Sequence, residues 1–213
     1  MMSIGGAAQV RREIARASAD FNHDGRRDVL SIDALSPRPV TDRQPWCGAG
    51  RKDTGQVDVT VRLSGRTSRT TDLNALFRES SLSFTAGPWS IVLADYNGDG
   101  RPDFNLGQYG GCNGWAYAIF TVLDDGAVSR LEVSGGDVRV IDFANSTRAL
   151  EPIRGGFVAR WYDNSRGHVR SVYCWNASTN QFVLRNETVG DSTEVRATKQ
   201  PVASNATGCQ ERH

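Results

Sequence analysis

The sequence predicts an all-β protein built from antiparallel sheets. Helix-forming residues are sparse, whereas Val, Thr, Ser, Gly and Trp are plentiful, as is typical of short strands joined by tight turns. Apolar and polar residues alternate in several short stretches, and turn signals separate these stretches about every ten residues. We expect the resulting hairpins to form a sandwich or a propeller-like assembly. No linker divides the chain, so we expect a single β domain over residues 1–213.

The first half of the chain supplies the clearest strand. In residues 56–63 (QVDVTVRL) apolar side chains alternate with polar ones, which predicts one buried face and one wet face. A Ser64-Gly65 turn follows, so residues 66–73 (RTSRTTDL) complete a hairpin. Residues 89–95 (WSIVLAD) form a further strand. Helix is minor, with two candidate segments: Arg11–Ala19 and Asp72–Glu79.

The second half predicts a hairpin and then a three-stranded meander. The hairpin joins residues 117–123 (YAIFTVL) to residues 127–133 (AVSRLEV) through an Asp-Asp-Gly turn. The strands of the meander are residues 156–163 (GFVARWYD), 168–176 (HVRSVYCWN) and 181–189 (QFVLRNETV). The polar tail from Glu194 to His213 is expected to be irregular.

Charge and hydropathy exclude two broad classes of partner. Lys and Arg number 25 against 24 Asp and Glu, so the balance offers no general attraction for nucleic acid or an anionic membrane. No segment is long and apolar enough to insert into a bilayer. The N-terminal MMSIGGAAQVRRE lacks the apolar stretch of a signal peptide. If the protein is exported, we expect its targeting segment to be absent from this chain.

The cysteines favour export. They are far apart and form no CxxC pair, which fits disulfides better than zinc or redox chemistry. Four buried free thiols in a cytosolic protein are the alternative. Pairing of neighbours in sequence would join the first to the second and the third to the fourth, but three connectivities are open. The four residues are Cys47, Cys112, Cys174 and Cys209.

Two segments repeat the pattern D-[FY]-N-x-D-G-R-x-D, at residues 20–28 and 95–103. Oxygen ligands at positions 1, 3 and 5 converge on one point only if the chain turns sharply, and glycine at position 6 permits that turn. The carbonyl at position 7 and the aspartate at position 9 complete the set, and such hard oxygen donors favour calcium. The candidate ligands are Asp20, Asn22, Asp24, Arg26 and Asp28 in the first loop, and Asp95, Asn97, Asp99, Arg101 and Asp103 in the second.

Neither loop is an EF-hand, because Ser31 and Leu106 stand where the closing glutamate belongs. The flanks are strand-like, and the motif resembles the calcium loops of FG-GAP and VCBS repeats, which join strands of propeller blades. The resemblance implies two structural Ca²⁺ ions. The missing ligand implies modest affinity, suited to the calcium-rich exterior of a cell. The alternative is that Asp and Asn form solvated Asx-turns without metal.

The sequence holds no recognisable catalytic set, so we expect no enzyme activity. The three histidines, His23, His168 and His213, do not pair with a nucleophile in any known motif. A glycosidase would need two carboxylates facing a groove. Glu132, Glu151, Asp142 and Asp163 are free to form such a pair, but surface roles explain them more simply.

Residues 107–120 (GQYGGCNGWAYAIF) combine glycines, one cysteine and aromatic residues in a short stretch. Glycine permits unusual backbone angles, and rigid aromatic side chains are enriched in binding hot spots. One interpretation is a binding loop that projects from the surface. The other is a tight turn whose Trp115 and Tyr117 pack in the core. The candidate contact residues are Tyr109, Asn113, Gly114, Trp115 and Tyr117.

The piece Asn113–Tyr117 (NGWAY) resembles the S-G-x-x-Y loop of bacterial lysozyme inhibitors, with asparagine in place of serine. The order of features over residues 89–187 is similar to that of periplasmic immunity proteins that neutralise peptidoglycan hydrolases delivered by an antibacterial type IV secretion system. That resemblance implies a periplasmic protein that inserts this loop into the cleft of a lysozyme-like hydrolase. Tyr117 would be the inhibitory side chain, and Gly114 would let the loop project.

A second function fits the sequence: an extracellular FG-GAP-type adhesion or carbohydrate-binding module. A groove lined by exposed tryptophans would favour it, and the candidates are Trp46, Trp89, Trp161 and Trp175.

Overall fold

The computed structural model describes residues 10–41, 43, 51–85, 89–109, 115–140, 150–190 and 209. It confirms an all-β fold: the described part of the chain forms fifteen strands and one short helix, α1 (Leu73–Phe77). Among the described residues, no helix has the length and apolar character needed to cross a membrane.

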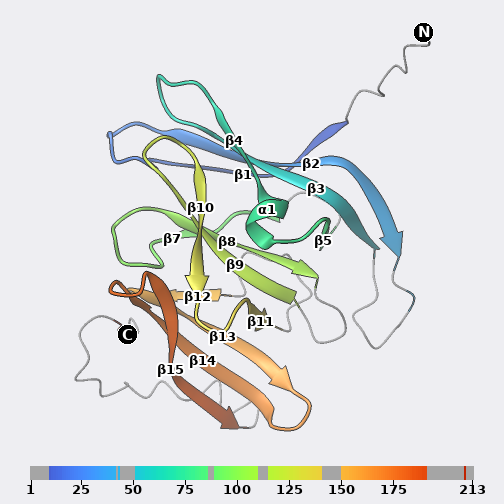
Figure 1. Cartoon of the computed structure of the whole chain (residues 1–213), viewed down its shortest axis with the longest axis vertical. Helices are drawn as coiled ribbons and strands as arrows, with labels where there is room; N and C mark the ends of the chain where they lie inside the picture. Colours follow the sequence, from blue (N-terminus) through green and yellow to red (C-terminus); the bar gives the residue numbers. More distant parts are fainter. Residues whose placement is uncertain are drawn as a thin grey trace.

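The strands form two sheets (Figure 1). The first has the order β4-β3-β2-β1-β6, with β5 paired to β3. Its strands are β1 (Arg11–Ala19), β2 (Asp28–Thr41), β3 (Arg51–Arg62), β4 (Arg69–Asp72), β5 (Leu82–Thr85) and β6 (Trp89–Ser90). The second has the order β12-β13-β14-β15-β10-β9-β8-β7, with β11 paired to β9. Its strands are β7 (Leu93–Ala94), β8 (Asp103–Tyr109), β9 (Trp115–Val122), β10 (Val128–Val133), β11 (Val138–Val140), β12 (Leu150–Ile153), β13 (Gly156–Asp163), β14 (Gly167–Asn176) and β15 (Gln181–Gly190).

One supersecondary unit occurs three times along the chain. It is a four-stranded antiparallel meander, formed by β1–β4, by β7–β10 and by β12–β15. In the first two meanders a D-x-N-x-D-G-R-x-D loop connects the first strand to the second. In the third, the Arg154-Gly155 turn takes that place. Figure 1 shows the three meanders succeeding one another from the blue end of the chain to the red.

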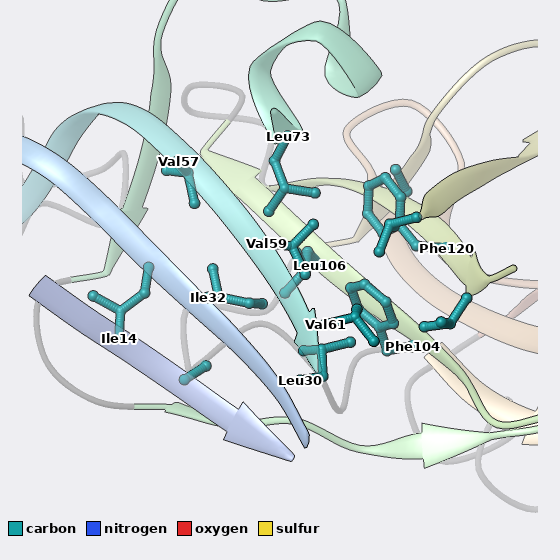
Figure 2. Packing of buried hydrophobic residues seen from close by; sticks show 14 of the residues in the cluster. Ile14, Leu30, Ile32, Val57, Val59, Val61, Leu73, Phe104, Leu106 and Phe120 are labelled. Atoms are coloured by element: carbon teal, nitrogen blue, oxygen red, sulfur yellow. The ribbon is translucent and has the colours of Figure 1, made fainter. Parts of the chain in front are cut away.

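Two apolar clusters hold these meanders together. Side chains of β2 and β3 such as Leu30, Val59 and Val61 pack against Phe104 and Phe120 of the second meander (Figure 2). The phenyl rings of Phe104 and Phe120 stack with their centroids 5.3 Å apart. A second cluster, which includes Tyr96, Tyr117, Phe157 and Phe182, joins the second meander to the third. Burial of these apolar surfaces is the main stabilising contribution.

The helix expected over Arg11–Ala19 is wrong, because this segment is strand β1. Its arginines, glutamate and alanines are good helix formers, but helix propensity is a small contribution, and pairing along β1 with β2 outweighs it. The pairing also buries Ile14 and Ala15 in the core. The expected helix within Asp72–Glu79 is confirmed as α1. The Asp72 carboxylate caps it by accepting hydrogen bonds from the Asn74 and Ala75 backbone N–H groups.

The strands of the second half agree with the sequence patterns, whereas residues 89–95 form only the fragments β6 and β7. One of the expected disulfides is present: Cys174 in β14 is bonded to Cys209, with their Cα atoms 5.6 Å apart. Cys47 and Cys112 lie outside the described residues. Of the tail beyond Glu194, only Cys209 is described.

Candidate functional site

The two aspartate loops share one backbone conformation. In each, the carboxylate at position 1 accepts a hydrogen bond from the backbone N–H of the glycine at position 6. The distance is 2.9 Å from Gly25 N to Asp20 and 3.0 Å from Gly100 N to Asp95. Both glycines have positive φ, 81° and 88°, which side chains rarely adopt. This is the sharp turn that the motif requires at position 6.

Positions 3 and 5 form consecutive Asx-turns in both loops. The Asn22 amide oxygen accepts from Asp24 N, and the Asp24 carboxylate accepts from Arg26 N. The second loop repeats both bonds, from Asp99 N to Asn97 and from Arg101 N to Asp99. The Asx-turns expected in the metal-free alternative are therefore present. Both interpretations of the motif share these turns.

The aspartate at position 9 anchors each loop to the core. Asp28 and Asp103 are both fully buried. Each accepts a hydrogen bond from the backbone N–H of the buried aromatic residue at position 2, Phe21 at 2.9 Å and Tyr96 at 3.0 Å. This contact explains why position 2 of the motif is aromatic. The buried ring fixes the loop on the sheet, and the aspartate at position 9 accepts a hydrogen bond from the backbone N–H of the same residue.

The loops differ in the second oxygen of this aspartate. Asp28 Oδ1 accepts a 2.7 Å hydrogen bond from Ser64 N, in the turn that follows β3. Asp103 Oδ1 is buried and accepts no hydrogen bond of good geometry. Burial raises the pKa of Asp103 to about 7, although the nearby Thr121 hydroxyl and the backbone N–H bonds act in the opposite direction. The second loop therefore keeps an acceptor oxygen that the first has already engaged.

The first connections of all three meanders lie together. A Cβ atom placed on Gly100 would lie 3.6 Å from Cε1 of His23, so the second loop contacts the first. A Cβ atom on Gly98 would lie 3.4 Å from the Cα of Gly155, in the turn between β12 and β13. The two acidic loops and this turn therefore form one continuous region. Motif spacing gave no signal for this adjacency.

The residues of the loops partly meet the requirements of a metal centre. No group of three or more Asp, Glu, His or Cys side chains that could hold an ion occurs within the described ranges. A site here would therefore have to add the amide oxygens of Asn22 and Asn97 and backbone carbonyls to the carboxylates, as calcium accepts. All of these donors are oxygens, and the buried Asp103 Oδ1, which accepts no hydrogen bond of good geometry, favours a cation at the second loop. The donor set thus fits Ca²⁺.

Arginine side chains of the second loop and of the β3–β4 hairpin contact the β9–β10 turn. Arg101 Nη1 lies 2.7 Å from the Asp124 carboxylate, and Arg66 donates to the Asp124 carbonyl at 2.8 Å. Arg69 pairs with Asp125 at 2.9 Å. The Arg101 side chain, at position 7 of the motif, therefore pairs with a residue outside the loop. Only the backbone carbonyl of Arg101 is available to a metal. Sequence reasoning missed these contacts, because the partners are distant in the chain.

The prediction that Tyr117 and Trp115 enter a partner's cleft is wrong. Tyr117 has 0% of its surface exposed and Trp115 has 3%, since both side chains pack in the second apolar cluster. The core-packing alternative is the one observed. Tyr109 is half-buried, its ring contacts Trp115, and Lys52 Nζ lies 2.8 Å from the centroid of the Tyr109 ring. Asn113 and Gly114 lie outside the described residues.

One comparison with known proteins covers both aspartate loops. Residues 20–104 match the family model of the FG-GAP-like repeat, a segment that runs from the first residue of the first loop to just beyond the second. A solved structure described as a Xanthomonas type IV secretion system related protein is similar, with 15% sequence identity, 93% of each chain covered and a TM-score of 0.46. No curated protein matches the chain.

Proposed function

We propose that this protein is an exported, non-catalytic binding protein whose two acidic loops hold structural calcium ions. The observation that carries the proposal is that both loops form the same glycine turn and the same two Asx-turns and contact each other. Ions bound there would stabilise the region where the first connections of the three meanders meet. The Cys174–Cys209 disulfide supports export, because disulfides persist in oxidising compartments.

The two loops should differ in affinity. Asp103 has an oxygen that accepts no backbone N–H group, whereas both oxygens of Asp28 already accept backbone N–H groups. A cation at the second loop would satisfy a buried oxygen that otherwise accepts no hydrogen bond of good geometry. We therefore propose that the second loop binds Ca²⁺ more tightly than the first.

Calorimetric titration of chelator-treated protein with CaCl₂ tests both points. The wild type should show two binding events, Asp99→Ala should lose the tighter one and Asp24→Ala the weaker one. At a calcium concentration of 100 times Kd, the tighter site should add about 2.7 kcal/mol to the free energy of unfolding. The melting temperature should rise accordingly.

Asp163→Ala is the matched control. The Asp163 carboxylate also accepts backbone N–H groups in a tight turn, but it stands outside both loops. Its replacement should leave both binding events unchanged. A wild-type titration without heat, together with a melting curve that chelator does not alter, would rule out calcium at either loop.

We propose that the partner is a peptidoglycan-degrading glycoside hydrolase of the lysozyme type, which this protein inhibits in the periplasm as an immunity protein. The resemblance of residues 89–187 to such proteins supports this assignment. Tyr117 and Trp115 take a supporting role in it: they fix the ends of β8 and β9 on the core. The contact to the hydrolase then falls to the segment between these strands, which contains Asn113 and Gly114.

A turbidity assay of peptidoglycan digestion by lysozyme-type hydrolases tests this assignment. Asn113→Arg should abolish inhibition and leave the melting temperature unchanged. Tyr117→Phe should inhibit as well as the wild type, because the ring that packs in the core is kept. Tyr117→Ala is unsuitable, since loss of a buried aromatic side chain costs about 3–5 kcal/mol of stability. Equal inhibition by Asn113→Arg and wild type would show that this segment does not contact the hydrolase.

The carbohydrate-binding alternative requires exposed aromatic side chains along a groove. Trp161 and Trp175 are only partly exposed: Trp161 lies beneath the Arg166 guanidinium, and Trp175 packs against Phe182. Trp46 and the side chain of Trp89 are outside the described set. Retention of the protein on insoluble peptidoglycan without any hydrolase would favour this second function.

A further inference from the structure

A hollow of about 330 Å³ lies on the first sheet, away from the calcium loops. Its volume is at the lower end of the range for small-molecule sites, about 300–1,000 Å³. The lining combines hydroxyl and amide side chains with one cation and no carboxylate, and consists of Leu35, Ser36, Arg38, Thr54, Gly55, Gln56, Ser80 and Ser81.

Two irregularities of the sheet create the hollow. Strand β2 bulges between Leu35 and Arg38, and Ser36 there has a positive φ of 44°, which is uncommon for a residue other than glycine. Opposite the bulge, β3 changes its partner from β4 to β5. The buried Asn74 side chain lies where β3 changes partner. Its amide oxygen accepts a hydrogen bond from Val57 N, and its amide nitrogen donates one to the Gly55 carbonyl. The walls are therefore held in place by the fold itself.

The polar groups of the hollow lie in a row across three segments. Arg38 is directly opposite Thr54 on the neighbouring strand, so the two side chains share one face of the sheet. The Thr54 hydroxyl is 2.9 Å from the Ser81 hydroxyl. Gly55 lies between these groups and Gln56 and contributes no side chain, which leaves the floor open. A guanidinium flanked by hydroxyl donors is the arrangement that recognises an oxyanion.

Arg38 is available for this role. It is exposed, and no carboxylate in the described ranges pairs with it. Most other arginines of the first sheet are already engaged, for example Arg11 with Asp33 and Asp58, and Arg12 with Asp53. We propose that this hollow is a binding site for an oxyanion group, held by the Arg38 guanidinium and the Thr54 and Ser81 hydroxyls. The oxyanion is either inorganic, such as sulfate, or the carboxylate of an acidic sugar.

Titration of the protein with sodium sulfate, with glucuronic acid and with glucose, followed by NMR chemical shifts, tests the proposal and separates the two sources. We expect saturable shifts with one or both of the charged probes and none with glucose. Tighter binding of glucuronic acid identifies the sugar as the source, and equal or tighter binding of sulfate identifies the inorganic ion. Absence of saturation with both charged probes overturns the proposal.

Arg38→Gln should weaken binding about tenfold or more, since a charge-assisted hydrogen bond is lost. Arg185→Gln, which removes an exposed arginine on β15, is the matched control and should bind as the wild type does. Gly55→Ala provides a second variant. Its Cβ atom would lie 3.4 Å from the Leu35 carbonyl oxygen and would take up space at the floor of the hollow. Unchanged affinity in Arg38→Gln would overturn the assignment, whichever probe binds.

Discussion

The phenol ring of Tyr117 lies against Gly107, its partner on the neighbouring strand. A Cβ atom at Gly107 would be 2.6 Å from Cζ of that ring, a separation that real side chains do not tolerate. The absence of a side chain at this one position of β8 thus makes the room in which the Tyr117 ring is buried.

Gly107→Ala should therefore lower the free energy of unfolding by about 1–3 kcal/mol, the range for overpacked cores. Urea denaturation measures the change. In a Tyr117→Leu background the same substitution should cost much less, because the ring that it displaces is gone. Equal costs in the two backgrounds would show that Gly107 is needed for some other reason.

Asp28→Ala should destabilise the first loop even in the presence of chelator. It leaves the buried N–H groups of Phe21 and Ser64 without their acceptors, at about 1–3 kcal/mol each. Asp28→Asn keeps one acceptor oxygen and should fall between alanine and wild type. Chemical denaturation in chelator checks the order, and equal stability of the three proteins would contradict it.

Asp163 should contribute to stability at neutral pH and not in strong acid. Hydrogen bonds from Ser165 and Arg166 lower the pKa of Asp163 to about 2. Because the folded-state pKa is below the unfolded value, the stabilisation is complete above about pH 4 and is lost as the pH falls toward 2. Asp163→Asn should therefore melt at a lower temperature than wild type at pH 7, and the difference should close near pH 2. A pH-independent difference would mean that the charge is irrelevant.

Asp58 should behave in the opposite way. Burial raises its pKa, and Asp72 and Asp33, which flank it on the adjacent strands, add to this effect against the opposing charge of Arg11. A raised folded-state pKa disfavours the ionised form, so its destabilising contribution should diminish as the pH falls from 7 through that pKa. Asp58→Asn should be at least as stable as wild type at pH 7. The increase in the free energy of unfolding that the wild type shows as the pH is lowered should be smaller in this variant. Urea titrations at pH 7 and pH 5 measure both.

The strands of this protein could be predicted from the sequence wherever alternation sets which face is buried. Residues 56–63 are the example, because the alternating apolar side chains Val57, Val59, Val61 and Leu63 define the buried face of the strand. The segment Arg11–Ala19 carries only two buried side chains, Ile14 and Ala15, so its structure depends on the partner strand and not on its own pattern.

The aspartate loops were predictable at the level of local conformation, since each residue of the motif has a role within nine positions. The contact of His23 with Gly100 and the pairing of Arg101 with Asp124 were not, because they join turns that the sequence separates. The burial of Tyr117 was one of two interpretations that the sequence left open, for a similar reason. An aromatic residue near glycines suits both a projecting loop and a packed strand, and only the position of Gly107 across the sheet decides between them.

The bond between Cys174 and Cys209 returns the end of the chain to the third meander as a covalent crosslink. A protease that cuts once between Gly190 and Cys209 therefore produces two fragments that travel together until a reductant separates them. In an oxidising compartment, such a nick would open the backbone without releasing the C-terminal piece.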